Sequence, residues 1–421
     1  MKRPLLVIAL SLSSLVLPAQ QTPVQQWIST VNGVTSGDEA PTCSYRAGSG
    51  YTYVAGNNTN GLFVVKFDNT GLVASSMEYV DSNNVQVVPE VILTDNMGQI
   101  YIGGYKYYGG EYHISAMHID AGMNVVWENS YNTHSSSIYL ESMAFDNTSS
   151  PSYLGYTGSI NDSISVGKVT LATSDFSWNV TTLPVGYNSG RGYDVKFNGG
   201  NMYICGKVNH PVSQNDAFVL KMNGAGSQVY FQTFSGSANM DDKAGKIVVN
   251  SSGEAYIYGT ANDPAQEFFL AKYSTSGFLL WKSQYIIPPG ENMEDPVDMV
   301  FNNFYSQIYT IGQTSNADLG NGALALFDPF TGVLNHSAIL SYPSLPSTES
   351  FKKITVDNAN NYYVSAIANS SSFLVAKYNS SNAPVFHVYY TQPVTGYAGT
   401  FVDVTGNVFI AGSINQSTTT Y

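Results

Sequence analysis

The stretch from Lys243 to Tyr285 contains four short β-rich runs that turn residues separate. Lys243-Ala-Gly-Lys-Ile-Val-Val-Asn250 is followed by the turn Ser251-Ser-Gly253 and then by Glu254-Ala-Tyr-Ile-Tyr-Gly259. Glu267-Phe-Phe-Leu-Ala-Lys-Tyr273 is joined through Ser274-Thr-Ser-Gly277 to Phe278-Leu-Leu-Trp-Lys-Ser-Gln-Tyr285. Such runs, bounded by Gly, Ser and Asn, are typical of an antiparallel meander. The stretch therefore predicts one four-stranded antiparallel sheet.

The second run of this unit recurs along the chain and each time ends in a small residue. Its end positions lie at intervals of 46 to 54 residues. A period of this length with four strands per unit is typical of radial blades. We therefore predict an all-β chain, a β-propeller of four-stranded antiparallel blades. The copies end at Gly56, Gly104, Gly158, Gly206, Gly259, Gly312, Ala366 and Gly412.

The two ends of the chain carry strands that belong to no complete set. Trp27-Ile-Ser-Thr-Val31 resembles an isolated fourth strand, and seven complete sets follow, from about Cys43 to Tyr390. A first strand, a second strand and a third strand then follow at 399–404, 407–412 and 417–421. We expect eight blades, the last of them closed by the N-terminal strand, because closure removes unpaired strand edges. Seven blades with a spare segment is the alternative.

These residues also carry a family resemblance. Phe268-Phe-Leu-Ala-Lys-Tyr-Ser-Thr-Ser-Gly-Phe-Leu-Leu-Trp281, after Gly253-Glu-Ala-Tyr-Ile-Tyr-Gly259, resembles the bacterial β-propeller repeat often labelled SBBP and is more distantly similar to the NHL-type propeller. The resemblance covers nearly all of the chain after its first 20 residues. It implies an exported propeller and little about chemistry. Lys168-Val-Thr170 lacks the usual Asp turn and Asn335 stands where Trp is expected, so we predict irregular blades there.

The first 20 residues have the pattern of a secretory signal peptide. A basic start, Met1-Lys-Arg-Pro4, precedes an apolar run from Leu5 to Leu17 and a small residue, Ala19. The run is too short to span a membrane comfortably. We therefore expect a signal peptide over 1–20, a single propeller domain over 21–421, and a protein exported to the periplasm, the cell surface or the medium.

The charge of the chain argues against some classes of binding partner, and its two cysteines argue against a disulfide. The formal net charge is −13 and the 17 Lys and Arg residues are scattered, so binding to nucleic acid or an anionic membrane is not expected. The only cysteines, Cys43 and Cys205, belong to repeats too far apart for the ~7 Å Cα separation that a disulfide allows. We expect both to be buried core residues.

The longer connections differ from repeat to repeat and fall on one side of a meander, where binding residues usually lie. Four tyrosines cluster in one such connection, and pairs of acids lie in others. Tyrosine offers large contact area at low entropic cost, although a Tyr-rich chain also produces Tyr-rich loops without any function. The predicted ligand-binding residues are Tyr105, Tyr107, Tyr108, Tyr112, Asp241, Asp242, Glu294 and Asp295.

We expect a non-enzymatic binding or structural module, a monomer that takes a glycan or protein ligand on this side. A polysaccharide hydrolase or lyase is one alternative, with its two carboxylates drawn from Asp241-Asp242 and Glu294-Asp295. A component or cargo of a bacterial surface-secretion system is another. No cofactor is expected. The histidines lack metal-ligand spacing, so no metal site is expected either, although adjacent acids can hold Ca²⁺ weakly.

Overall fold

The computed structural model is built of β-strands. It describes the chain in thirteen ranges. The described residues are 5–11, 24–31, 40–59, 61–147, 149–212, 214–236, 241–262, 265–316, 319–342, 349–369, 372–390, 394–403 and 406–414.

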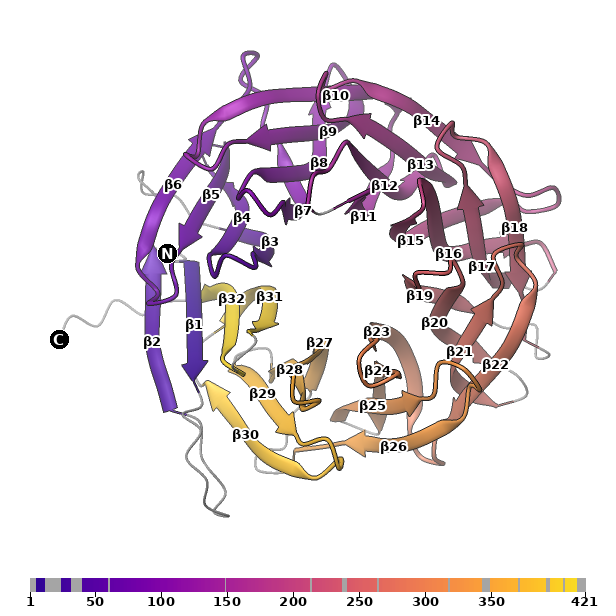
Figure 1. Ribbon diagram of the computed structural model, residues 1–421. Helices are drawn as coiled ribbons and strands as arrows, with labels where there is room; N and C mark the ends of the chain where they lie inside the picture. The colour runs from indigo at the N-terminus through magenta and orange to yellow at the C-terminus, as the bar shows by residue number, and fades with distance from the viewer. Residues whose placement is uncertain are drawn as a thin grey trace. The chain divides into compact units, whose positions relative to one another are not determined.

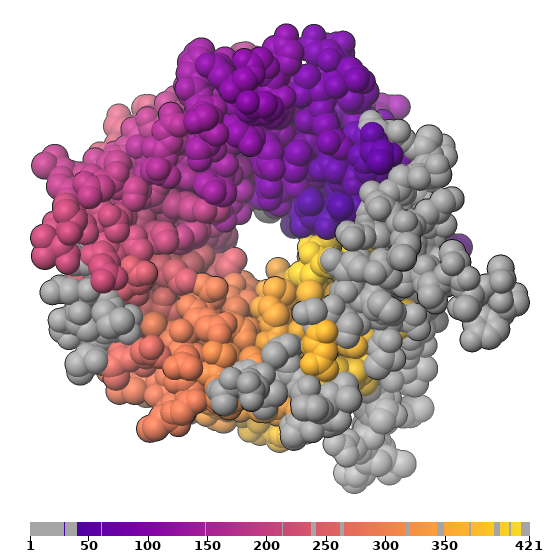
Figure 2. Space-filling view, turned by 180° about the vertical axis from the view of Figure 1, so that it is seen from behind, coloured from indigo at the N-terminus to yellow at the C-terminus, as the bar shows by residue number. Residues whose placement is uncertain are grey.

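The chain divides into two compact units. The first contains Met1–Tyr108, Met117–Glu128 and Thr348–Tyr421, and the second contains Gly109–Ala116 and Asn129–Ser347. Within each unit the sheets follow one another side by side, with the first strand of a sheet at one edge and the fourth at the other (Figure 1). Figure 2 shows the opposite side in a space-filling view, in which the blades of the second unit, coloured from magenta to orange, pack against one another.

The second unit contains four antiparallel sheets, each made of four strands in chain order. Their strands are β11 (Ile138–Phe145), β12 (Tyr153–Ile160), β13 (Ser163–Thr170) and β14 (Phe176–Thr182); β15 (Ser189–Asn198), β16 (Asn201–His210), β17 (Gln214–Met222) and β18 (Gln228–Phe234); β19 (Lys243–Val249), β20 (Ala255–Asn262), β21 (Gln266–Tyr273) and β22 (Leu279–Ile286); and β23 (Asn292–Asn302), β24 (Gln307–Asn316), β25 (Leu319–Phe327) and β26 (Leu334–Leu340).

The first unit contains two further sheets of this kind and one sheet made from both ends of the chain; the sheet β7–β10 has residues in both units. The strands are β3 (Ala40–Arg46), β4 (Thr52–Asn58), β5 (Gly61–Phe67) and β6 (Val73–Tyr79); β7 (Val88–Thr94), β8 (Ile100–Tyr108), β9 (Glu111–Ile119) and β10 (Val125–Ser135); β27 (Glu349–Val356), β28 (Tyr362–Ala368), β29 (Ser372–Tyr378) and β30 (Pro384–Tyr390); and β31 (Val394–Val402), β32 (Val408–Ile414), β1 (Leu5–Ser11) and β2 (Val24–Val31).

The architecture is that of a β-propeller with four-stranded antiparallel blades, as the repeat predicts. The seven sets of consecutive strands expected between Cys43 and Tyr390 are all present, from β3–β6 to β27–β30. The two irregular repeats still form complete sheets, β11–β14 and β23–β26, because backbone pairing does not depend on an Asp turn or a Trp. No helix among the described residues is long and apolar enough to cross a membrane.

The sheet made from both chain ends differs from the sequence prediction in its third strand. Its order is β2-β1-β32-β31, so Val24–Val31 is the outermost strand, as expected for the isolated fourth strand. The third position is taken by Leu5–Ser11, which pairs with β32 on one side and β2 on the other. The expected third strand, 417–421, lies outside the described residues. Val7 and Ile8 are β-branched residues, which are favoured in strands, so the apolar run of the leader pattern can also form a strand.

A β-bulge in the first strand explains the glycine that ends six of the eight repeats. In β15 the register shifts between Gly192 and Asp194, opposite Gly206 in β16. A Cβ added to Gly206 would overlap the carbonyl oxygen of Arg191, so no side chain fits between the two backbones. All eight described sheets carry a bulge at this position of the first strand. The same overlap with a first-strand carbonyl occurs at Gly56, Gly104, Gly158, Gly259 and Gly412.

The tyrosine of the repeat supports a lysine from the third strand. In one blade the Lys221 ammonium lies 5.0 Å from the centroid of the Tyr203 ring and donates to the Thr275 carbonyl of the next blade at 3.0 Å. In the next blade, Lys272 lies 5.3 Å from the Tyr256 ring centroid. A cation over an aromatic face is attracted by about 0.5–2 kcal/mol. This recurring pair joins neighbouring blades and accounts for the repeated tyrosine without a binding role.

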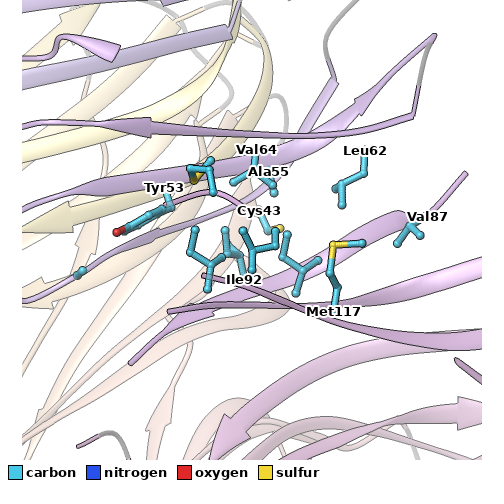
Figure 3. Packing of buried hydrophobic residues seen from close by; sticks show 13 residues of the cluster. Cys43, Tyr53, Ala55, Leu62, Val64, Val87, Ile92 and Met117 are labelled. Carbon is cyan, nitrogen blue, oxygen red and sulfur yellow. The ribbon is translucent and has the colours of Figure 1, made fainter. Parts of the chain in front are cut away.

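Apolar side chains fill the space between blades, and both cysteines belong to these cores. In the first unit, Cys43 packs with Tyr53, Ile92 and Met117 between two sheets (Figure 3). Both cysteines are free and buried, which confirms the prediction. Burial raises the pKa of the Cys43 thiol to about 12 and that of Cys205 well above its ordinary value, so neither thiol is a nucleophile at neutral pH.

Candidate functional site

A cavity of about 270 Å³ lies in the second unit, on the side of the variable connections. Three successive blades contribute to it, through the ends of second strands and the starts of first and third strands. These strand ends meet because the longer connections of a meander all leave from one side of the sheet. The lining residues are Lys207, Gln214, Asn215, Asp241, Asp242, Lys243, Thr260, Gln266, Met293 and Glu294.

Three of the eight predicted site residues line this cavity, and two of them are neighbours with different roles. Asp242 is fully buried; its backbone N–H donates to the Asn215 carbonyl at 2.8 Å and its carboxylate accepts the Gly236 N–H. Asp241 is exposed, and its Oδ1 accepts the Asn215 side-chain amide at 2.7 Å. Asp242 therefore holds the connection before β19 in place, while Asp241 presents its carboxylate at the cavity.

Glu294 and Asp295 are adjacent on β23, and their carboxylates have different surroundings. Glu294 is exposed and lines the cavity. Asp295 does not line it and forms an ion pair with Lys243, which does. The N–H of Met293 donates to the Gln266 side-chain oxygen at 2.9 Å and ties β23 to the start of β21. The pair thus places one carboxylate at the cavity and uses the other to orient an ammonium group.

The tyrosine cluster forms a β-hairpin, so the predicted loop is wrong, whereas the ligand-binding role of the four tyrosines stays a prediction. β8 extends through Tyr108, Gly109 and Gly110 form the turn, and β9 begins at Glu111. Both glycines have positive φ, 65° and 89°, which favours a tight two-residue hairpin turn. Tyr107 and Tyr108 are 57% and 53% exposed, whereas Tyr105 and Tyr112 are half-buried, and none of the four lines the cavity.

We expect the double variant Tyr107→Ala plus Tyr108→Ala to keep its melting temperature within a few degrees of the wild type. Both rings are more than half exposed, and substitutions at such positions usually change stability by less than about 0.5 kcal/mol each. Differential scanning calorimetry measures the shift, with Tyr258→Ala, a fully buried ring, as the contrasting variant. A comparable drop in both variants would show that the hairpin rings are structural.

Other acids of the connections have structural partners. Glu291 accepts hydrogen bonds from Thr314, Asn316 and Asn321 at 2.8–3.1 Å and so fixes the β24–β25 hairpin. In the turn that follows β5, the Oδ1 of Asp68 accepts the N–H groups of Thr70 and Leu72. Among the described residues, no group of three or more His, Cys, Asp or Glu could hold a metal ion.

The lysines and amides of the cavity are not among the site residues predicted from the sequence. They are Lys207, Gln214, Asn215, Lys243 and Gln266. They lie up to 59 positions apart, and each is an ordinary polar residue at the end of a strand. Only their common placement next to a variable connection could have indicated them.

The comparisons with known proteins bear on the fold. A scan against protein-family models finds no match, and a search of curated proteins finds no relative. Chaetomium thermophilum Sqt1 bound to the N-terminus of the ribosomal protein L10 is 10% identical with a TM-score of 0.56, over 90% of this chain and 97% of that one. The Dos1 propeller is 10% identical with a TM-score of 0.54, over 90% and 93%. Pseudomonas aeruginosa periplasmic gluconolactonase PpgL is 13% identical with a TM-score of 0.49, over 80% and 96%. At such identities, the likeness to Sqt1 and the Dos1 propeller shows the β-propeller fold alone.

Fold and site together define a class, a β-propeller with a small polar cavity on the side of its variable connections.

Proposed function

We propose that the chain is an exported, non-enzymatic β-propeller that binds a glycan in the cavity containing Asp241 and Glu294. The mixed lining of this cavity is the observation that carries the proposal. Carboxylates, side-chain amides, lysines and a threonine hydroxyl supply hydrogen-bond donors and acceptors in the same small space. Ligand sites commonly combine a concave shape with a few such convergent polar groups.

The charges of the cavity favour a neutral ligand with many hydroxyl groups. Three carboxylates and two ammonium groups line it, and Asp295 already pairs with Lys243. Counting Asp295, four carboxylates stand against two ammonium groups, so the net negative charge disfavours an acidic ligand. Sugar hydroxyls both donate and accept, so they match carboxylates, amides and ammonium groups alike.

The division of roles among the acids limits the carboxylates that a hydrolase could use here to Asp241 and Glu294. A glycosidase needs two carboxylates free to exchange protons or attack the sugar. Asp242 is buried with a backbone donor and Asp295 is paired with Lys243. Asp241 and Glu294 are left to contact a ligand, and Asp241 already accepts the Asn215 amide. Hydrolase activity stays an alternative that the experiment below distinguishes.

Glycan-array screening of the purified chain, followed by calorimetric titration of the best neutral oligosaccharide, tests the proposal. We expect Asp241→Ala or Glu294→Gln to weaken binding at least tenfold, because a hydrogen bond to a charged group contributes about 1.5–3 kcal/mol. Asp175→Asn, an exposed acid in the turn before β14, is the matched control and should bind like the wild type.

Three outcomes would overturn the proposal. Release of reducing ends that Glu294→Gln abolishes would make the protein a hydrolase. A ligand that is a protein and no glycan would reassign the site. Equal glycan binding by the wild type and both variants would place the glycan elsewhere.

The remaining expectations from the sequence belong to the same proposal. The leader pattern over 1–20 and the SBBP-type repeat support export. Removal of this leader would take β1 out of its sheet, so we propose that in the exported protein the N-terminal strand Val24–Val31 and the third strand expected at 417–421 close an eighth blade with β31 and β32, because closure would leave no unpaired edge for aggregation. The module acts as a monomer, needs no cofactor, and binds Ca²⁺ at most weakly through its exposed acids.

A further inference from the structure

A second cavity, of about 280 Å³, lies in the first unit among the first strands of three successive blades. Its residues come from the ends of β3, β27 and β31 and from the turn between β3 and β4. The Asp241 cavity, in contrast, uses the starts of first strands. The lining residues of the second cavity that can contact a ligand or shape the space for it are Arg46, Gly48, Lys353, Thr355, Phe401 and Asp403.

The Arg46 guanidinium is held rigidly at this cavity. Its Cζ lies 3.4 Å from the centroid of the Phe409 ring. One terminal nitrogen donates to the Thr52 hydroxyl at 2.9 Å and the other to the Asn69 side-chain oxygen at 2.7 Å. Burial lowers the pKa of Arg46 to about 10, so the group stays positive at neutral pH. A planar, fixed guanidinium is well suited to carboxylate recognition.

Lys353 adds a second positive charge. Its ammonium lies 5.8 Å from the centroid of the Phe401 ring. In the part of the chain that the structure describes, it has no carboxylate within ion-pair distance. The one acid of the cavity, Asp403, accepts the backbone N–H and the side-chain amide of Asn407 at 2.9 and 2.8 Å, and lies 3.9 Å from Arg46. The cavity therefore carries a net positive charge, in a chain whose net charge is −13.

The rest of the lining suits a sugar ring beside this charge. Phe401 is half-buried and provides an aromatic wall, and the half-buried Thr355 provides a hydroxyl. A Cβ built on Gly48 would meet nothing within 4 Å, so there is open space next to the backbone. The cavity thus combines two cations, one aromatic face and room for a ring.

We propose that this second cavity binds an acidic sugar, with the carboxylate of a uronate residue between Arg46 and Lys353 and the sugar ring against Phe401. This site is independent of the Asp241 cavity, because the two cavities share no residue and differ in charge. The second site distinguishes acidic from neutral polysaccharide.

Calorimetric titration of the full chain with trigalacturonate, and with its methyl ester, tests the proposal. We expect the ester to bind at least tenfold more weakly than the free acid. Lys353→Gln should weaken trigalacturonate binding at least tenfold, and Lys353→Arg should retain most of it. Phe401→Leu, which keeps an apolar side chain but removes the aromatic face, should also weaken binding.

The controls separate this site from the first one. Lys207→Gln, at the Asp241 cavity, and Glu294→Gln should leave trigalacturonate binding unchanged. Melting temperatures of all variants are measured first, and Lys353→Gln should match the wild type because its ammonium has no ion pair to lose among the described residues. Equal affinity for acid and ester, no binding at millimolar trigalacturonate, or full competition by acetate or sulfate alone would each overturn the proposal.

Discussion

Replacing Asp194 with Ala is expected to lower the free energy of unfolding by about 3–5 kcal/mol, since it breaks a buried ionic network and leaves its partners unpaired. Asp194 is buried on β15 and joins three successive blades of the second unit. One carboxylate oxygen accepts the Ser142 hydroxyl of β11 at 2.9 Å and the Lys196 ammonium at 2.7 Å. The other accepts the Ile247 N–H of β19 at 3.2 Å.

The contribution of Asp194 to stability should also depend on pH. Burial raises the pKa of Asp194, but Lys196, Lys246 and the hydrogen bonds lower it by more, so the carboxyl titrates below its ordinary range in the folded state. A depressed folded pKa contributes stability that is complete above the ordinary carboxyl pKa of about 4 and is lost as the pH falls through the folded value. The stability gap between wild type and Asp194→Asn should therefore shrink from pH 7 toward pH 3.

Urea unfolding at several pH values measures both effects, as changes in the midpoint at constant m-value. Asp295→Ala is the matched control, because Asp295 also pairs with a lysine but is 67% exposed. Its loss should cost less than about 1 kcal/mol. Equal losses in the two variants would mean that Asp194 does not tie the blades together.

Gly206→Ala is expected to destabilise the protein by about 3 kcal/mol, at the upper end of the usual cost of overpacking. The added methyl group would overlap the Arg191 carbonyl oxygen and would lie 2.6 Å from the Phe218 ring. Backbone in a bulged strand pair cannot move without breaking ladder hydrogen bonds on both sides. The side chains of the blade core, Phe218 among them, must therefore shift to make room for the methyl group.

Thermal and urea unfolding of Gly206→Ala and Gly48→Ala provide a matched comparison. Gly48 has no atom within 4 Å of an added Cβ and no positive φ. Its replacement should leave stability unchanged or slightly raised, because alanine restricts the unfolded chain. If both variants had the stability of the wild type, the bulge would not be the reason for the repeated glycine.

Much of the fold is readable from the repeat. The spacing of the glycines, the turn residues and the paired β-rich runs are local properties, and they correctly predict four-stranded antiparallel blades from Cys43 to Tyr390. Buried cysteines follow from the same reasoning, because they lie at core positions of the repeat. The segment Tyr105–Tyr112 forms a hairpin and not the predicted loop, because Gly109 and Gly110 make a two-residue turn and the tyrosines on either side extend the two strands.

The candidate sites could be predicted only in part. Acid pairs in variable connections drew attention to Asp241 and Glu294, and both line one cavity. The sequence could not show that Asp242 and Asp295 face structural partners, since adjacent residues of an extended chain point in opposite directions. Arg46, Lys353 and Phe401 carry no motif at all.

The strands, their grouping into blades and the turns between them can be predicted from local sequence, because a strand and its hairpin partner lie within a few residues of each other. Three features became clear from the structure alone: which strand completes the sheet of β31 and β32, why most repeats end in glycine, and which polar groups meet in the two cavities. These features arise between backbones and side chains of different strands and blades, often more than 50 positions apart. Their geometry depends on packing, and no local pattern in the chain records it.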